Sequence, residues 1–312
     1  MPRPKPIASL SLDLDNQWAY MKTHGDPAWE SLPSYLDVAV PRALHALSAR
    51  KLTITFFVVG LDAAQAGNHA VLRSIAEQGH EIGNHSFRHE PWLHLYSRQE
   101  LEGELQSAEQ HIEQATGQRP RGFRGPGFSH SPELIDLLAK RGYLYDASTF
   151  PTFLGPVARA YYFMKSNLDK KQKQDRGQLF GPLSEGLRSN RIYRWKTQEG
   201  ALVEVPVTTV PWVKLPFHVS YLLYLAGFSR RLALGYFRAA LWLCRLNQIQ
   251  PSLLLHPLDF LSREDVPELA FFPAMDLSFH AKAEFVARVL DVYCEKFEVL
   301  TIEQQVRRQA KG

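Results

Sequence analysis

Aspartates and histidines at short spacings are the residues of this sequence whose types and positions could do chemistry. Asp13 and Asp15 are two residues apart in a segment of alternating polar and apolar residues, so their carboxylates share one face of an extended strand. His85 and His89 are four residues apart, and two imidazoles at this spacing can bind one metal ion from a helical turn or a tight loop. Two histidines and one carboxylate leave positions open for water and substrate, as hydrolytic metal sites require.

Two further polar residues follow candidate strands. Arg124, in GFRGPGF, is placed to hold a carboxylate, and His256, in LLLHP, stands where a general acid would be needed. Each of these features also has an ordinary structural explanation, because paired aspartates often form turns and a lone His or Arg at a strand end is commonly a surface residue. The coincidence favours a site, since successive strand ends that each carry such a group would meet at one rim of a barrel.

Alternating strand and helix patterns predict the α/β fold that must position these groups. Strands are expected at 7–15, 52–60, 80–86, 121–125, 143–148, 202–208, 252–257 and 297–302. About eight strands with intervening helices predict a β/α barrel that forms a single domain over residues 1–312. Two stretches depart from this alternation of strands and helices: a polar excursion at about 155–200 and an amphipathic helical segment at about 211–250.

The composition limits the classes of protein that this chain can belong to. Its 312 residues are 45% hydrophobic and 22% charged, which indicates a globular protein and excludes a disordered one. The net charge of +4 is spread along the chain, so no nucleic-acid partner is expected. Two cysteines exclude a cysteine-rich zinc site. The N-terminus carries no apolar stretch of signal-peptide length, so we expect a cytoplasmic protein.

The motifs, taken in order, resemble those of the polysaccharide deacetylases, whose catalytic domain is of the NodB type (carbohydrate esterase family 4). SLDLDN at 11–16 carries a D-x-D variant of the first motif, similar to the branch with cytoplasmic deacetylases and lipid-linked sugar deformylases. The later motifs match HSFRH at 85–89, FRGPG at 123–127, DASTF at 146–150 and LLH at 254–256. The resemblance covers residues 9–257 and implies a distorted (β/α)7–8 barrel that removes an N-acetyl or N-formyl group from an amino sugar.

The resemblance also implies how the chemistry is divided among the matched residues. Asp15, His85 and His89 would bind a divalent metal, commonly zinc, which polarises the acyl oxygen and lowers the pKa of its bound water. Asp13 would be the general base that takes a proton from this water. Arg124 would orient Asp13.

The remaining matched residues would serve the leaving group and the acyl pocket. His256 would protonate the departing amine, with Asp146 as its charge partner. The backbone N–H near Gly127 would help to hold the oxyanion. Phe150 and Leu254 would line the pocket for the acyl group, and Phe150 stands where the family usually has Trp, which leaves the size of the acyl group open.

The segment 217–246 indicates a second partner. Arg231, Arg238 and Arg245 repeat every seven residues, so on a helix they form one cationic stripe. The remaining surface is expected to carry Leu234, Phe237, Leu241 and Trp242. Such a helix suits the interface of an anionic membrane, although a pair of ordinary amphipathic helices packed on the barrel gives the same pattern.

Combined with the missing export signal, this segment favours a polyprenyl-phosphate-linked sugar as substrate and a peripheral location at the inner face of the membrane. Two other functions remain open. One is a metal-independent C–N hydrolase like the allantoinase-related branch of the fold, which the intact set Asp15, His85 and His89 disfavours. The other is a non-catalytic barrel that binds carbohydrate or lipid, which the presence of Asp13 and His256 disfavours.

Overall fold

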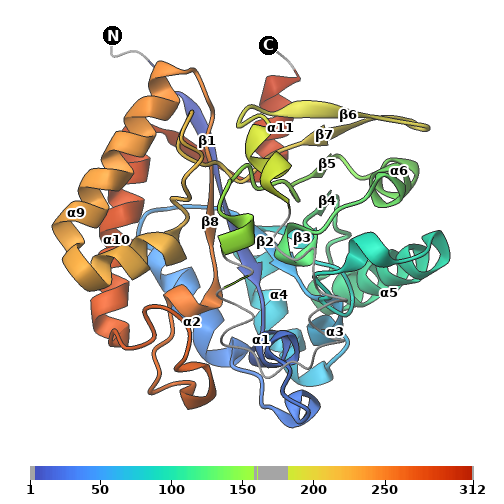
Figure 1. Ribbon diagram of the computed structural model, residues 1–312. Coiled ribbons are helices and arrows are strands. Elements are labelled where there is room, and N and C mark those ends of the chain that lie inside the picture. The colour runs from blue at the N-terminus through green and yellow to red at the C-terminus, as the bar shows by residue number, and fades with distance from the viewer. Residues whose placement is uncertain (1–3, 158–159, 161–181, 311–312) are drawn as a thin grey trace.

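A mostly parallel sheet forms the centre of the protein, as the computed structural model shows for residues 4–157, 160 and 182–310 (Figure 1). The strands are β1 (Ile7–Leu14), β2 (Thr55–Val58), β3 (Glu81–Asn84), β4 (Gly122–Phe123), β5 (Tyr145–Asp146), β6 (Tyr193–Thr197), β7 (Gly200–Glu204), β8 (Ser252–Leu255) and β9 (Glu298–Leu300). They are ordered β6-β7-β5-β4-β3-β2-β1-β8, with β9 paired to the start of β1. Only the β6–β7 pair is antiparallel among these strands.

The sheet curves into a distorted barrel. The chain beyond β7 returns to β8, where the main-chain N–H of Thr208 donates to the carbonyl of Ser252 at 3.1 Å. The Thr208 hydroxyl also accepts from the N–H of Ser252 at 2.8 Å, so the segment that follows β7 is hydrogen-bonded to β8 at the far end of the strand order. The expected α/β barrel fold is therefore confirmed.

Helices cover the outside of this barrel. They are α1 (Gln17–His24), α2 (Leu36–Ser48), α3 (Gly60–Ala63), α4 (His69–Glu77), α5 (Arg98–Thr116), α6 (Pro132–Lys140), α9 (Val219–Leu246), α10 (Phe279–Lys296) and α11 (Ile302–Gln309). Neighbours in the ring pack on each other, α2 on α4, α4 on α5 and α5 on α6, while α9 packs on α10. Figure 1 shows α9 and α10 on the opposite side of the sheet from α5 and α6.

All eight strands expected from the sequence are present, and β6 is an additional one. Strand β6 lies within the polar excursion at 155–200, and its sequence YRWKT is half-exposed along its length. It pairs with β7 through a tight turn, so it needs no apolar face of its own. Residues 158–159 and 161–181 of the same excursion lie outside the described residues.

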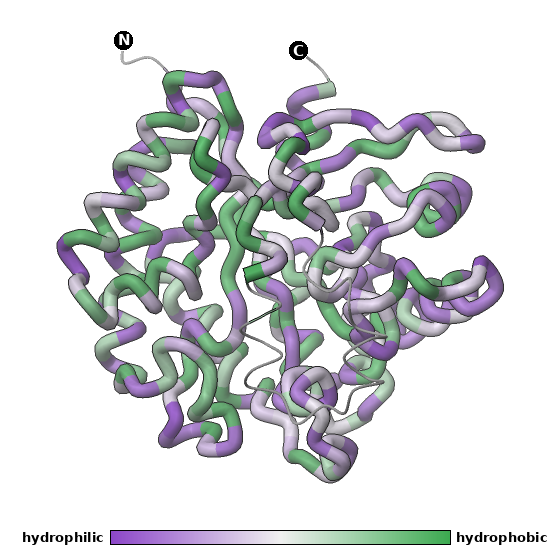
Figure 2. The backbone as a smooth tube through the Cα atoms, in the orientation of Figure 1, coloured by the Kyte–Doolittle hydropathy of each residue, from purple (hydrophilic) through white to green (hydrophobic). Residues whose placement is uncertain are grey.

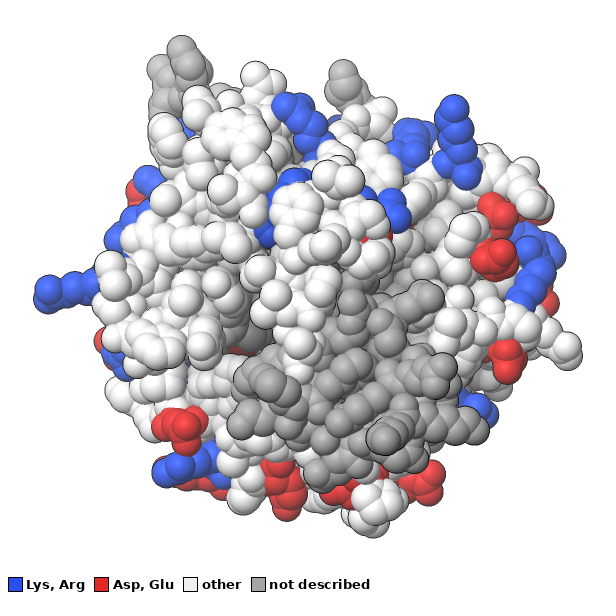
Figure 3. Space-filling model, viewed as in Figure 1, with Lys and Arg blue, Asp and Glu red and all other residues white. Residues whose placement is uncertain are grey.

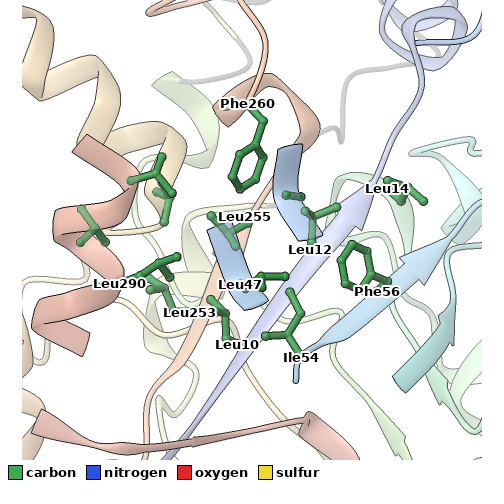
Figure 4. Packing of buried hydrophobic residues seen from close by; sticks show 14 of the residues in the cluster. Leu10, Leu12, Leu14, Leu47, Ile54, Phe56, Leu253, Leu255, Phe260 and Leu290 are labelled. Atoms are coloured by element: carbon green, nitrogen blue, oxygen red, sulfur yellow. The ribbon is translucent and has the colours of Figure 1, made fainter. Parts of the chain in front are cut away.

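Successive side chains of β1 point alternately to the two faces of the sheet. One face packs in the apolar core, and the other faces the interior of the barrel. Leu10 and Leu12 point into the main apolar cluster, where Figure 4 shows them near Ile54 of the neighbouring strand segment and Leu253 and Leu255 of β8. The other face of β1 carries serine and aspartate toward the inside of the barrel. Burying a leucine side chain contributes about 1.5–3 kcal/mol, so the apolar face fixes the register and with it the place of the aspartates.

The structure of helix α9 corrects one prediction made for the amphipathic segment, namely which of its apolar residues lie on the surface. Phe237 and Leu241 are buried in the core and face α10, so they are not part of an outer surface, as the repeat alone suggested. The helix is interrupted at Ser229, whose backbone is extended. Figure 2 shows hydrophilic and hydrophobic residues alternating along its turns. Among the described residues, no helix combines the length and apolar character needed to cross a bilayer.

The buried His80 makes the stability of this fold depend on pH. Its Nδ1 accepts the main-chain N–H of Ile54 at 3.1 Å, and burial lowers the pKa of His80 from 6.5 to about 4. Between pH 6.5 and 4 the unfolded chain therefore binds more protons at this position than the folded one, and stability falls as the pH falls.

Because of His80, we expect the free energy of unfolding to be about 2.5 kcal/mol lower at pH 4.5 than at pH 7 and above. Asparagine at this position keeps an acceptor for the N–H of Ile54 and does not titrate. Denaturant melts of the wild type and of His80→Asn at pH 7 and pH 4.5 measure the difference. Equal losses of stability in both proteins would show that His80 does not carry this dependence.

Candidate active site

Five parallel strands of the same sheet bring polar residues to one rim of the barrel. Asp15 follows β1, His85 follows β3, Arg124 follows β4, Asp146 ends β5 and His256 follows β8. Because the carboxyl ends of parallel strands meet at the same edge, residues up to 241 positions apart in sequence lie together here. The rim is the arrangement that the sequence predicted.

Asp15, His85 and His89 form a buried cluster. One carboxylate oxygen, Oδ1 of Asp15, lies 3.2 Å from Nε2 of His85 and 2.9 Å from Nε2 of His89. Neither contact has hydrogen-bond geometry, so Oδ1 of Asp15 and both ring nitrogens of His89 are buried without a hydrogen-bond partner among the described residues. Unpartnered buried oxygen and imidazole atoms that converge on one point fit a divalent metal ion.

A contact behind the cluster fixes the orientation of one imidazole. Nδ1 of His85 lies 2.6 Å from the main-chain oxygen of Arg124, so this nitrogen carries the hydrogen and Nε2 keeps its lone pair toward Asp15. Burial by itself raises the pKa of Asp15, but the imidazoles of His89 and His85 hold that pKa well below its usual range. The carboxyl group of Asp15 is therefore ionised, as a metal ligand must be.

The loop that carries both histidines is held in a tight turn. Ser86 and His89 adopt positive φ angles of 61° and 51°, and the Ser86 hydroxyl accepts the main-chain N–H of His89 at 3.1 Å. Glu104 of α5 accepts the N–H groups of the two residues between them at 2.9 and 3.0 Å. These contacts offset the strained backbone and aim both rings at Asp15.

Asp13 and Arg124 form a second buried group beside the cluster. The guanidinium NH1 donates to Oδ1 of Asp13 at 2.6 Å and to the hydroxyl of Ser11 at 2.9 Å, while Nε donates to the carbonyl of Ala147 at 3.0 Å. Its face lies 4.3 Å from the ring centroid of Phe57. Asp13 is thus held by a fully buried cation in a fixed direction, next to the residues that can hold a metal.

His256 has different hydrogen-bond partners from the one that the resemblance implies. Its Nδ1 lies 3.0 Å from the hydroxyl of Ser220 in the first turn of α9, and its main-chain N–H donates to Asp259 at 2.9 Å. Asp146 instead accepts the Ser148 hydroxyl at 2.5 Å and lies against the carboxyl group of Glu204. Among the described residues, no hydrogen bond joins His256 to Asp146.

Glu204 makes the surroundings of Asp146 unusual. Burial raises the pKa of Glu204 well above its usual range, and the charge of Asp146 acts in the same direction. Glu204 accepts hydrogen bonds from Thr149, at 3.0 and 2.6 Å, and from the indole of Trp195 at 2.8 Å. A protonated Glu204 can therefore donate a hydrogen bond to the carboxyl group of Asp146.

The predicted pocket residues lie near the same rim, and the structure adds one residue to them. The ring of Phe150 lies 5.8 Å from that of His218, which lies 5.9 Å from that of His256. Gly127 has a positive φ of 56°, and a Cβ there would come within 2.8 Å of Pro91. Leu254 is buried and pairs with Ser11 on the inner side of β1.

Three residues beside His256 were missed in the sequence: His218, Ser220 and Asp259. His218 stood alone in sequence, with no other candidate near it. Asp259 follows His256 by three residues in HPLD, and this short spacing was the one available signal. Ser220 comes from a different element 36 residues away, so only the fold reveals its contact.

Comparisons with known proteins agree with this fold. A family model described as polysaccharide deacetylase matches residues 29–145, a range that holds His85, His89 and Arg124. A peptidoglycan deacetylase of Helicobacter pylori is 31% identical over 112 residues, which make up 36% of this chain and 37% of that protein. The chain spans about a third of the length of the curated relatives that it matches.

Two solved structures share the fold. A candidate polysaccharide deacetylase from Mycobacterium smegmatis superposes with a TM-score of 0.64 at 22% identity, over 100% of this chain and 93% of that chain. Puue allantoinase superposes with a TM-score of 0.58 at 16% identity, over 98% of this chain and 91% of that chain. With the family match, they place the chain in a class of α/β barrels. Residues 29–145 of the chain match the polysaccharide deacetylase family (carbohydrate esterase family 4, NodB-type domain).

Proposed function

We propose that this protein is a metal-dependent hydrolase that removes an N-acyl group, acetyl or formyl, from an amino sugar. The observation that carries the proposal is the joint geometry of two buried groups at one rim: Asp15 with His85 and His89, and Asp13 with Arg124. The first group supplies a ligand set with open positions, and the second supplies a held carboxylate beside it. A barrel that only binds sugar would need neither group.

The residues of the chain divide the reaction between a base and an acid. A divalent metal held by Asp15, His85 and His89 would polarise the acyl oxygen and make its bound water easier to deprotonate. Asp13 takes the proton of the attacking water, and the hydrogen bond from Arg124 holds that carboxylate in a fixed direction. As the C–N bond breaks, His256 gives a proton to the nitrogen that leaves as the amine. Two protons are thus moved, one from water and one to nitrogen.

The direct test of this function is acyl release. N-acetylated and N-formylated amino sugars, free and polyprenyl-phosphate-linked, are incubated with metal-loaded protein and followed by mass spectrometry. The proposal expects loss of the acyl group from at least one sugar, and no loss after the metal is removed with a chelator. Release that continues unchanged without metal would favour the allantoinase-like alternative.

We further propose that the substrate is lipid-linked and that α9 binds an anionic membrane surface. The outer side of α9 is apolar along its length: Tyr224, Phe228, Leu232, Trp242 and Leu246 are 44%, 77%, 76%, 62% and 59% exposed. Side chains of this size at such exposure leave most of their apolar surface in water. A lipid interface would bury them, and tyrosine and tryptophan are enriched at that depth.

Charge on the border of this apolar strip favours an anionic surface. Arg231, Arg238 and Arg245 are all exposed and follow one another at two helical turns, along the edge of the strip. Figure 3 shows the side of the molecule that carries α9 as mostly uncharged, with single basic side chains projecting from it. The Ser220 turn at the start of the same helix reaches His256, so a surface bound by α9 would lie beside the rim.

We expect the three arginines to control vesicle binding. Each basic residue near an anionic bilayer contributes about 1 kcal/mol, so replacing Arg231, Arg238 and Arg245 with glutamine lowers partitioning on the order of 100-fold at low salt. Co-sedimentation with vesicles of phosphatidylglycerol and phosphatidylcholine measures the fraction of protein that is bound. Added salt should weaken the binding of the wild type.

The matched control removes the same charge from another face. Arg119, Arg121 and Arg194 are exposed away from α9, and their replacement with glutamine should leave most of the binding intact. Equal sedimentation of the wild type and the α9 variant would contradict the membrane role of this helix.

A further inference from the structure

The ring of His218 lies at the rim between two residues that the site already includes. Its centroid is 5.8 Å from that of Phe150, which the resemblance assigns to the acyl pocket, and 5.9 Å from that of His256, the expected acid. The angles between the ring planes are 65° and 75°, so His218 meets both rings edge to face. None of the matched motifs includes His218, and its place beside the acid comes from the start of α9.

A hydrogen bond at the start of α9 fixes which ring nitrogen of His218 carries the hydrogen. His218 is the N-cap residue of this helix, and its Nδ1 accepts the main-chain N–H of Tyr221 at 3.4 Å. A main-chain N–H can only donate, so Nδ1 presents its lone pair to the helix. In the neutral imidazole the hydrogen is therefore on Nε2.

The surroundings of His218 keep its imidazole neutral. Burial lowers the pKa of His218 from 6.5 to about 3, and the charge of His256 acts in the same direction. The other rings beside it are those of Phe150 and Tyr221, and burial raises the pKa of the Tyr221 phenol, so neither ring brings a charge. Near neutral pH, His218 is a hydrogen-bond donor through Nε2 and places no positive charge next to the acid.

The Nε2–H group of His218 is available to a ligand. The two nitrogens lie on opposite sides of Cε1, so the edge of the ring that carries Nε2 is turned away from the N–H of Tyr221. Among the described residues, Nε2 of His218 has no hydrogen-bond partner, and the side chain is partly exposed. A neutral donor in this position suits an uncharged oxygen, such as that of a hydroxyl or carbonyl group.

We propose that His218 is a substrate-binding residue that donates a hydrogen bond from Nε2 to an oxygen of the amino sugar beside the leaving nitrogen. The class of ligand rests on the proposed function, but the tautomer of His218 does not. His256 must approach the leaving nitrogen to give it a proton, and the carbon that bears this nitrogen in an amino sugar has a neighbour that bears oxygen. Such an oxygen comes within reach of the ring next to His256.

Nitrogen-15 chemical shifts test the tautomer and the contact. The histidine signals of the zinc-loaded protein are recorded through the non-exchanging ring protons, and those of His218 are assigned by their loss in His218→Asn. We expect the Nε2–H form in the wild type. Asp13→Asn, which should bind sugar without turning it over, is then titrated with N-acetylated and N-formylated amino sugars. At least one sugar should shift Nε2 of His218 more than Nδ1.

Two substitutions separate the donor from the helix cap. Asparagine at position 218 keeps an acceptor for the N–H of Tyr221 but is too short to place a donor where Nε2 was, whereas glutamine reaches that place but caps a helix poorly. We expect His218→Asn to keep the midpoint of denaturant unfolding and to raise KM about 3- to 10-fold, with kcat within about twofold. His218→Gln should lower the midpoint and keep KM near that of the wild type.

The outcomes distinguish this contact from the reaction itself. A wild-type Nδ1–H tautomer, or a His218 signal that no sugar shifts, would overturn the inference even where acyl groups are released. An unchanged KM in His218→Asn, or a KM that rises only in His218→Gln, would also overturn it. A sugar that shifts Nε2 of His218 but never loses its acyl group in the wild type would overturn the proposed function and leave the contact standing.

Discussion

Replacing Asp13 with asparagine is expected to lower kcat about 100- to 10,000-fold while the protein keeps its metal. Asparagine has the same shape and can still accept a hydrogen bond from Arg124, so the fold and the direction of the side chain are retained. It cannot take a proton from water. Metal analysis and initial rates of acyl release on the same preparation separate the two effects.

The matched variant is Asp15→Asn, two residues further along the same strand face. An amide is a far weaker metal ligand than a carboxylate, so this variant should lose the metal as well as the activity. If Asp13→Asn also lost the metal, Asp13 would belong to the coordination shell and not to proton transfer. Substantial residual hydrolysis by Asp13→Asn would remove it from the mechanism.

Arg124→Met is expected to have the largest effect on stability, about 3–5 kcal/mol of unfolding free energy. The Arg124 guanidinium is fully buried and its partner Asp13 is 4% exposed, so methionine would leave a buried carboxylate without its cation. Ser11 and the carbonyl of Ala147 would lose their donors as well. Denaturant melts at neutral pH measure the loss.

The double variant Asp13→Asn/Arg124→Met tests the cause. Because the uncompensated charge is removed, the double variant should be more stable than Arg124→Met alone. Arg141→Met, which breaks a partly exposed pair with Glu109, should cost about 0–1 kcal/mol. A double variant less stable than Arg124→Met would show that packing, and not charge, explains the loss.

The strands that carry the site were predictable because their patterns are local. The leucines of β1 alternate with serine and aspartate, and this period of two fixes which face is buried. Capping signals are also local: Ser97 and Glu100, three residues apart, form a capping box at the start of α5. Strand β6 was missed because its residues are polar and half-exposed, and its pairing with β7 needs no apolar pattern.

The site was predictable to the extent that its residues follow strands. Asp15, His85 and Arg124 follow β1, β3 and β4, which run parallel in one sheet with only β2 between the first two, so the sheet brings them together without further information. The surroundings of His256 were not predictable in the same way. Ser220 comes from a helix, and the resemblance supplied Asp146 in its place, because a motif carries no information about a contact that lies outside it.

For helix α9, the sequence repeat alone predicted only part of what the fold shows. The seven-residue spacing of arginine correctly indicated an exposed cationic edge, since Arg231, Arg238 and Arg245 are exposed. It could not say which apolar residues face the barrel. Phe237 and Leu241 pack in the core, and the exposed strip is formed by other residues, because the barrel and α10 cover one side of the helix.

Calorimetric titration of the metal-free protein with Zn²⁺ measures whether Asp15, His85 and His89 hold one divalent metal ion. We expect one tightly bound ion per chain in the wild type, and no such binding in His85→Ala/His89→Ala, whose fold is checked by circular dichroism. Stoichiometric binding that survives the loss of both histidines, or no binding by the folded wild type, would contradict it.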